Sequence, residues 1–207
     1  MSRATSDEIT IQFDGSKCIH ARRCVLGLPA VFKPGTPGGW LFPENARAAE
    51  IARVIDACPS GALSYTRHDG GMGEQVPPVN TVRLWENGPN ELRGDLWIDE
   101  APTTRMLLCR CGQSKNKPFC DNSHVAAGFT ATSEPETQDA QETEIGGDLT
   151  VTPLPNGPVK IEGHVEVIAA SGRQVAVGEK MFLCRCGQSA NKPFCDGSHT
   201  RAGFTTE

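Results

Sequence analysis

Residues 184–199 read CRCGQSANKPFCDGSH and residues 109–124 read CRCGQSKNKPFCDNSH, so one segment rich in Cys occurs twice in this chain. The similarity continues beyond the final His of each segment, where residues 128–130 and 203–205 both read GFT. A long repeat of this kind indicates two copies of one structural unit.

The segments upstream of the two Cys/His stretches predict β-strands. Runs rich in β-branched residues flank an Asn-Gly-Pro sequence at Asn87 and again at Asn156, and Asn-Gly between such runs is typical of a hairpin turn. The expected strands are 81–85, 92–98, 149–152, 159–161 and 165–168. Each copy is therefore expected to contain a β-hairpin region, a Cys/His loop and one helical turn. Asp121 and Asp196, or the Ser two residues later, are the expected N-caps of these turns.

Composition limits what the rest of the chain can be. The 207 residues are 38% hydrophobic and 6% aromatic, with 22 Gly and 15 Pro, so we expect short elements and a thin core stabilised by metals or disulfides. The net charge is −5 without a basic block, which argues against nucleic acid and anionic membranes as partners. Nine Cys, without a signal sequence or an apolar run long enough to span a membrane, indicate a cytoplasmic metal or redox protein.

The Cys/His stretches each offer three thiols and one imidazole at the spacing Cys-x-Cys-x8-Cys-x3-His. This spacing alone fits zinc and iron–sulfur centres equally well, with buried free thiols as the remaining alternative. Gly112 and Gly187 follow the second Cys and would let the backbone approach an inorganic centre. Lys117 and Lys192 lie in the same loops, either as solvated side chains or as charges that tune a cluster.

This pattern resembles the signature of the CDGSH iron–sulfur (mitoNEET-like) family, Cys-x-Cys-x2-Ser-x3-Pro-x-Cys-Asp-Gly-Ser-His. The second stretch matches it in full, and the first differs at Asn122, which tolerates the positive φ that Gly would adopt. The resemblance implies one 2Fe–2S cluster per stretch, with two ligands on the inner iron and two on the outer iron. The implied ligands, in that order, are Cys109, Cys111, Cys120 and His124 for the first cluster, and Cys184, Cys186, Cys195 and His199 for the second.

The N-terminal region has a separate group of Cys residues. Cys18, Cys24 and Cys58, the last followed by Pro, resemble the ligands of a divergent single-cluster 4Fe–4S ferredoxin domain. The resemblance implies one cluster. Three Cys fit a 3Fe–4S cluster, whereas a 4Fe–4S cluster would need a fourth ligand, for which the candidates are His20, water or an outside ligand. A domain without any cluster is the alternative.

The residues around these Cys predict one strand at 9–13 and one helix at 46–57, which ends before Pro59. Arg22 and Arg23 lie between two of the Cys. They either offset the charge of a cluster, face an acidic partner or are ordinary surface charges.

Together these patterns predict an α+β protein. A small ferredoxin-like domain is followed by two β-rich repeats, which the family resemblance implies to form an intrachain pseudo-dimer with a β-cap. An acidic segment without Lys or Arg is expected to be a solvated connector. The expected boundaries are 7–65 (ferredoxin-like), 66–78 (linker), 79–130 (first CDGSH domain), 131–148 (acidic linker) and 149–207 (second CDGSH domain).

The sequence shows no catalytic dyad or triad, phosphate loop or dinucleotide fingerprint, so we expect a protein that is not an enzyme. The expected function is electron transfer with proton-coupled, acid-labile clusters, because a neutral His replaces one thiolate and must stay deprotonated to bind iron. Cluster transfer, redox or pH sensing, and a structural zinc protein are the alternatives. The expected partner is a redox protein or an apo iron–sulfur acceptor, and the tandem repeat favours a monomer. His68 and His164 are expected to be solvated.

Overall fold

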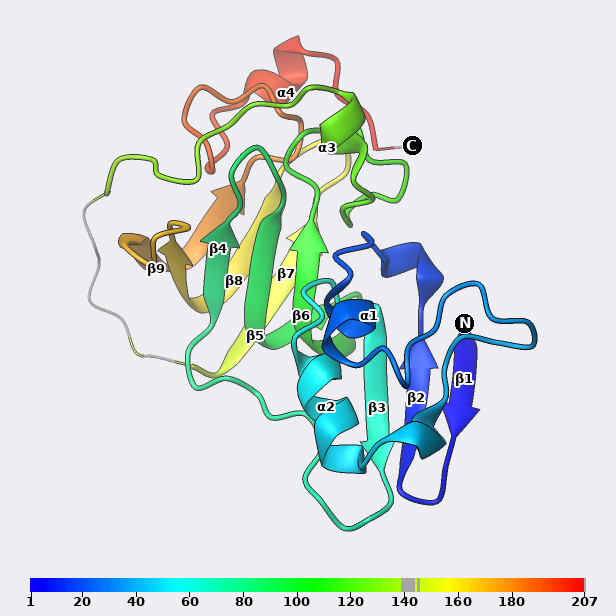
Figure 1. Cartoon of the computed structure of the whole chain (residues 1–207). Coiled ribbons are helices and arrows are strands. Elements are labelled where there is room, and N and C mark those ends of the chain that lie inside the picture. The colour runs from blue at the N-terminus through cyan, green and yellow to red at the C-terminus, as the bar shows by residue number, and fades with distance from the viewer. Residues whose placement is uncertain (139–143, 145, 207) are drawn as a thin grey trace. The chain divides into compact units, whose positions relative to one another are not determined.

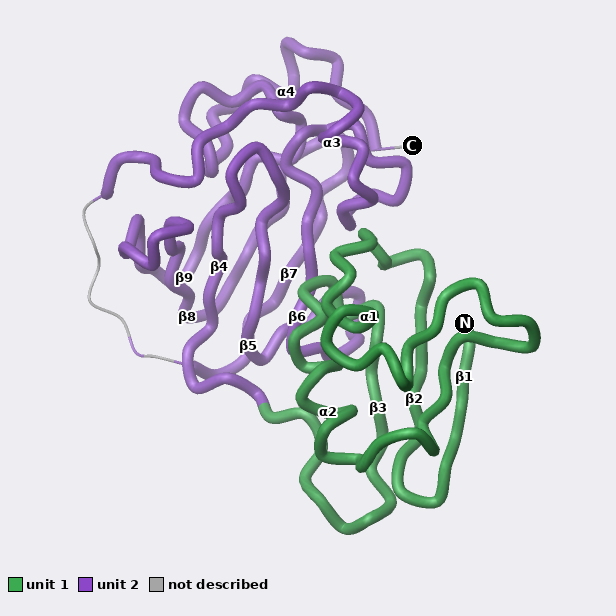
Figure 2. Tube along the Cα trace, in the orientation of Figure 1, with its two compact units in different colours: residues 1–75 green, residues 76–207 purple. Residues whose placement is uncertain are grey.

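The computed structural model describes residues 1–138, 144 and 146–206. The chain folds into two compact units, residues 1–75 and residues 76–207 (Figure 2). Across the described residues, no helix combines the length and the apolar composition that a bilayer crossing requires.

The first unit contains three antiparallel strands in the order β1-β2-β3 and two short α-helices (Figure 1). Its elements are β1 (Ser2–Thr5), β2 (Ile9–Phe13), α1 (Arg23–Gly27), α2 (Ala48–Asp56) and β3 (Leu63–Arg67), with 3-10 turns η1 (Gly15–Lys17) and η2 (Pro43–Asn45). Ile9 and Ile11 of β2 pack with Ile51 and Ile55 of α2 in one apolar cluster. The expected strand at 9–13 is confirmed, whereas β1 precedes the expected domain start and β3 extends beyond its expected end.

The helix expected at 46–57 is shorter in the structure because a tertiary contact fixes its start. The Glu8 carboxylate accepts a hydrogen bond from the Ala48 N–H at 3.0 Å, which satisfies one of the free donors of the first turn. The first unit bears out the expected exposure of His68 and adds a side-chain contact to it. This side chain is exposed, but its Nε2 lies 2.8 Å from Oγ1 of the buried Thr10.

The described residues of the second unit form one six-stranded sheet and two single-turn helices. Its elements are β4 (Thr81–Leu84), β5 (Asn90–Ile98), β6 (Ala101–Leu108), α3 (Ser123–Ala126), β7 (Asp148–Pro153), β8 (Val159–Ile168), β9 (Gln174–Leu183) and α4 (Ser198–Arg201). Each repeat therefore contributes three strands, one more than the expected hairpin. The strands expected at 159–161 and 165–168 form the single strand β8, whose register shifts between Glu162 and Val165. His164 lies at this shift, partly buried, with Nδ1 3.6 Å from Glu179 Oε1, and not in a solvated turn.

The sheet joins the two repeats by an exchange of neighbours. Within the first repeat β5 pairs antiparallel with β4 and β6, and within the second β8 pairs antiparallel with β7 and β9. Between repeats, β4 pairs parallel with β8, and β7 pairs parallel with β5. The first strand of each repeat thus lies beside the second strand of the other. One apolar core, which includes Leu92 and Val167, contains side chains from both repeats.

Asn80 connects the backbone at the place where β4 and β7 adjoin. Its side chain is fully buried and donates to the carbonyls of Gly147 and His164, both at 2.9 Å. Its Oδ1 accepts from the Asp95 N–H at 2.9 Å. Gly94 has a φ of +154°, and a Cβ there would lie 2.0 Å from Asn80 Oδ1, so the bend in β5 requires Gly.

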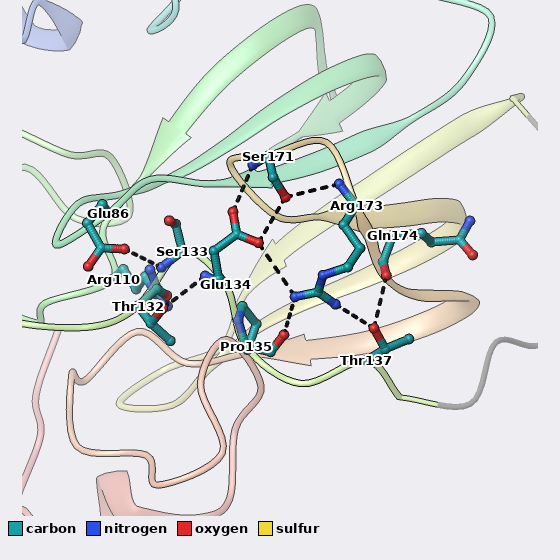
Figure 3. Close-up of polar contacts among 10 residues, drawn as sticks. All are labelled: Glu86, Arg110, Thr132, Ser133, Glu134, Pro135, Thr137, Ser171, Arg173 and Gln174. Carbon is teal, nitrogen blue, oxygen red and sulfur yellow. Dashed lines mark hydrogen bonds and ion pairs between the residues drawn. The ribbon is translucent and has the colours of Figure 1, made fainter.

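The first part of the expected solvated connector packs against the turn between β8 and β9 (Figure 3). The Glu134 carboxylate accepts from the N–H and the hydroxyl of Ser171 at 2.8 and 2.9 Å. Arg173 donates to the Pro135 carbonyl at 2.6 Å and to the Thr137 hydroxyl. Residues 131–138 are mostly exposed, as expected, but this segment is also held in place, because residues distant in the sequence bind its polar groups. Asp139 and Glu142 lie outside the described residues.

Candidate iron–sulfur sites

The two Cys/His loops begin where β6 and β9 end, and each brings its four expected ligands together as two pairs. In the first loop the Cys109 and Cys111 sulfurs lie 3.8 Å apart, and Cys120 Sγ lies 3.5 Å from His124 Nδ1. In the second loop the corresponding distances are 3.8 Å and 3.4 Å, between the ligands Cys184 and Cys186 and between Cys195 and His199. The two loops therefore present the same donor arrangement.

Each loop is closed by one Asp and one Ser. In the first loop Asp121 accepts the Lys115 N–H at 2.8 Å and the Ser123 N–H at 3.0 Å, while the Ser114 hydroxyl donates to the Phe119 carbonyl at 2.6 Å. The equivalent bonds of the second loop are made by Asp196 and Ser189, at distances of 2.6 to 2.9 Å.

The helical turns of the two loops correct the expected N-caps. Asn122 and Gly197 occupy the N-cap positions, with φ of +70° and +83°, and the preceding Asp accepts the N–H of the first helical residue. The expected positive φ at Asn122 is confirmed. The N–H groups of both N-cap residues also donate to the neighbouring ligands, Cys120 Sγ and Cys195 Sγ, at 3.4 Å. Such N–H donors stabilise a thiolate.

The buried thiols favour binding to a cation. Burial raises the pKa of Cys120 to about 11 and also raises the pKa of Cys186. The thiol of Cys111 donates to Cys109, which lowers the pKa of Cys109 and raises that of Cys111. Burial lowers the pKa of His124, so its ring is held in the neutral form that binds metals. Bound metal is what would keep all three thiolates of the loop ionised.

The two loops contact each other directly. A Cβ at Gly112 would lie 2.5 Å from the carbonyl oxygen of Cys186, and a Cβ at Gly187 would lie 2.5 Å from that of Cys111. Both Gly residues have a φ of +80°. These Gly residues therefore have a role that the sequence did not predict: they allow the backbone of one loop to approach the backbone of the other loop.

The two loop lysines bind backbone atoms of their own loops. Lys117 Nζ donates to the Ser114 carbonyl at 2.7 Å, and Lys192 Nζ donates to the Ser189 carbonyl at 2.6 Å. The view of these lysines as simply solvated is therefore replaced by a structural role in closing each loop.

The Cys residues of the first unit line one cavity of about 730 Å³. Cys18, Cys24 and Cys58 contribute to its wall together with His20, and the lining is mostly apolar. The His20 N–H donates to Cys18 Sγ at 3.4 Å, and His20 has a φ of +54°. Burial raises the pKa of Cys24. The structure therefore brings all four candidate ligands of the N-terminal region to the same cavity.

The arginines at this cavity differ in their contacts. Arg23 donates to the carbonyl of Ala57, which ends α2, at 3.3 Å. Arg22 lies exposed with a φ of +60°. Arg23 therefore also stabilises the fold, while the role of Arg22 is not decided by its contacts.

A protein-family model described as an iron-binding zinc finger of CDGSH type matches residues 87–125 and 156–200. A second model, described as a divergent 4Fe-4S mono-cluster, matches residues 4–68. This chain belongs to the CDGSH iron–sulfur family. It is a tandem CDGSH protein with an N-terminal divergent 4Fe–4S domain, and thus an iron–sulfur protein.

Two curated relatives share part of this CDGSH protein. They are the uncharacterized protein YjdI of Escherichia coli K12 and that of Escherichia coli O157:H7, each 38% identical over 68 residues. The matched segment covers 31% of this chain and 82% of each relative.

Two residues of the CDGSH loops escaped the sequence analysis. Arg110 and Arg185 each stand between the first two Cys of a loop, and both are buried. The sequence did contain one indication of their importance, because an Arg occurs at the same position in both copies. The pattern of residues alone did not indicate that a charged side chain would be buried there.

Proposed function

We propose that the second unit carries two 2Fe–2S clusters and transfers electrons one at a time. The observation that carries this proposal is the division of each donor set into pairs. Two sulfurs bound at 2.3 Å to one tetrahedral metal lie about 3.8 Å apart. The Cys109–Cys111 and Cys184–Cys186 distances have this value, so each pair suits one metal ion.

A single zinc ion per loop would need all four donors around one point. Within residues 1–138, 144 and 146–206, no three Cys, His, Asp or Glu side chains gather closely enough to surround one ion. Two pairs per loop instead suit a two-iron cluster. Cys109 and Cys111 would hold the inner iron, and Cys120 and His124 would hold the outer iron. A bound cluster of this kind supplies one-electron redox chemistry.

The protein's own residues explain the expected response to acid. The His124 ring is a ligand only while its metal-binding nitrogen is unprotonated, so acid competes with iron at that position. His199 occupies the same place in the second loop and is only partly buried. We therefore propose proton-coupled redox behaviour and loss of the clusters at low pH.

The exchange of strand neighbours supports an intrachain pseudo-dimer. The pairings β4–β8 and β5–β7 are equivalent under exchange of the two repeats, as are the Gly112–Cys186 and Gly187–Cys111 approaches. The sheet then serves as the β-cap above both loops. One chain would supply both halves, so we propose a monomer in which electrons can pass between neighbouring clusters.

The cavity of the first unit supports a third cluster. Three Cys suit a 3Fe–4S centre, and His20 is placed in the same wall to complete a 4Fe–4S centre. We propose a cytoplasmic carrier, and not an enzyme, whose partner is a redox protein or an apo iron–sulfur acceptor.

The function is tested on anaerobically purified protein by a redox titration followed by electron paramagnetic resonance and by visible spectra from pH 8 to pH 5. The proposal expects two reducible 2Fe–2S signals and bleaching in acid that His199→Cys suppresses for one cluster. Stable release of clusters to an apo-ferredoxin, without reversible redox cycling, would favour cluster transfer instead. A colourless protein that contains zinc would contradict the proposal.

A further inference from the structure

The side chains of Arg110 and Arg185 are buried, and among the described residues neither forms an ion pair with a carboxylate, although Glu86 lies near Arg110. They are 1% and 3% exposed. Arg110 donates to the carbonyl of Thr132 at 2.8 Å (Figure 3). It also donates to the carbonyl of Trp85 at 3.1 Å. Arg185 donates to the carbonyl of Gly157 at 3.0 Å and to that of Leu154.

All of these hydrogen-bond acceptors are neutral, although the donors are charged. Over the part of the chain that the structure describes, no carboxylate forms an ion pair with either guanidinium. An arginine side chain carries its positive charge throughout the neutral pH range. A buried cation is costly unless an anion lies close to it. Further negative charge close to them would therefore stabilise both arginines.

The contact between the two loops places that charge in the opposite repeat. Gly112 approaches the backbone of Cys186, and Gly187 approaches that of Cys111, so each Cys-Arg-Cys segment lies against the other. The ionisable groups near Arg110 are the Cys184 sulfur in the opposite loop and the Glu86 carboxylate.

The same relation holds in reverse for Arg185, which lies near the Cys109 sulfur of the first loop. The two arginines are thus arranged crosswise, each beside the inner-pair ligands of the other repeat. Arg185 also lies over the Phe204 ring, 5.6 Å from the ring centroid, and Arg110 differs from Arg185 in one further respect. The buried Nε–H of Arg110 has no acceptor among the described residues, which leaves one donor directed at no protein group.

We propose that Arg110 and Arg185 are the counter-ions of the two clusters, each for the cluster of the opposite repeat. The proposal rests on the proposed function, since it requires two iron–sulfur clusters in the second unit. One-electron reduction adds one negative charge to a cluster, and a fixed buried cation favours that more negative form. The arginines therefore raise both reduction potentials. Each arginine belongs to one loop but acts on the cluster of the other loop, so a change in one loop alters the potential of the other cluster.

The test compares four variants of the full chain, Arg185→Met, Arg185→Lys, Arg110→Met and Arg110→Lys. The potential of each cluster is measured by a redox titration followed by electron paramagnetic resonance. A His124→Cys or His199→Cys background assigns the signals, because an all-Cys cluster has a lower potential.

Arg185→Met is expected to lower the potential of the first cluster more than that of the second, and Arg110→Met to do the reverse. The expected change is roughly tenfold in the ratio of reduced to oxidised cluster, which is about 59 mV for a one-electron couple. The Lys variants keep the charge and are expected to stay closer to wild type.

Equal or larger shifts at the cluster of the same repeat would overturn the proposal, as would Lys variants that match the Met variants. If neither Met variant retains iron, the Lys variants decide the question. Iron retained by the Lys variants supports a requirement for positive charge, and iron lost from them overturns the proposal. A wild-type protein that holds zinc and no iron would instead reject the proposed function before any variant is compared.

Discussion

Replacing Asn80 with Ala should destabilise the second unit strongly, because this side chain ties together the backbone where the two repeats exchange strands. It is fully buried and makes three hydrogen bonds, with Gly147, His164 and Asp95. Each net hydrogen bond contributes about 1 kcal/mol, and the groups left behind are buried without a partner. We therefore expect a loss of about 3 kcal/mol in the free energy of unfolding.

Hydrogen–deuterium exchange read by mass spectrometry suits this prediction because it reports each unit separately. A loss of about 3 kcal/mol corresponds to a fall of roughly a hundredfold in the protection of the slowest amides of the second unit. The matched control is Asn45→Ala in the first unit, which removes one exposed hydrogen bond to the Ala30 carbonyl. A fall of less than about threefold for Asn80→Ala would refute the role assigned to the strand junction.

Three further changes test other parts of the structure. Gly112→Ala should lower the thermal stability and the iron content more than the control Gly172→Ala. Both Gly residues have a positive φ, but only at Gly112 would the added Cβ lie 2.5 Å from backbone atoms, so equal effects of the two variants would refute the loop contact. Hydrogen bonds from the Arg67 side chain lower the pKa of Asp69 to about 2, below the pKa of this residue in the unfolded chain. The stability that this interaction adds to the first unit should be complete above about pH 4 and lost as the pH falls toward 2. An Asp69→Asn variant whose unfolding has the same pH profile as the wild type would contradict this prediction. Arg173→Ala should speed limited proteolysis within residues 131–138, and an unchanged cleavage rate would show that this segment is held by other contacts.

The Cys/His loops could be predicted from the sequence because their ligands and the residues that close them are local. Asp121 reaches Lys115 and Ser123 within a few residues, and the same contacts recur in the second copy. The positive φ of Asn122 follows in the same way, from a residue type that tolerates it at a position where the other copy has Gly.

The third strand of each repeat could not be predicted because its residues do not alternate. Met106, Leu107 and Leu108 of β6 are all buried in succession, so no period of two is visible there. Strand propensity depends on neighbours that the sequence does not reveal. In β9 the exposed pair Glu179 and Lys180 interrupts the apolar pattern for a similar reason.

The exchange of strands and the burial of the two loop arginines depend on contacts between distant segments. Glu8 as the cap of α2, and Glu134 as the partner of Ser171, illustrate the same limit. A composition-based argument assigns such carboxylates to solvent, because it has no information on the backbone N–H groups that the fold brings to them.

The central claim is that each CDGSH loop binds two irons through two ligand pairs, and the metal content tests it most directly. Iron, acid-labile sulfide and zinc are measured in anaerobically purified protein. Two 2Fe–2S clusters require about four irons and four sulfides, and a third cluster in the first unit raises the iron to about seven or eight. About two zinc ions per chain with no sulfide, one for each loop, would contradict the account.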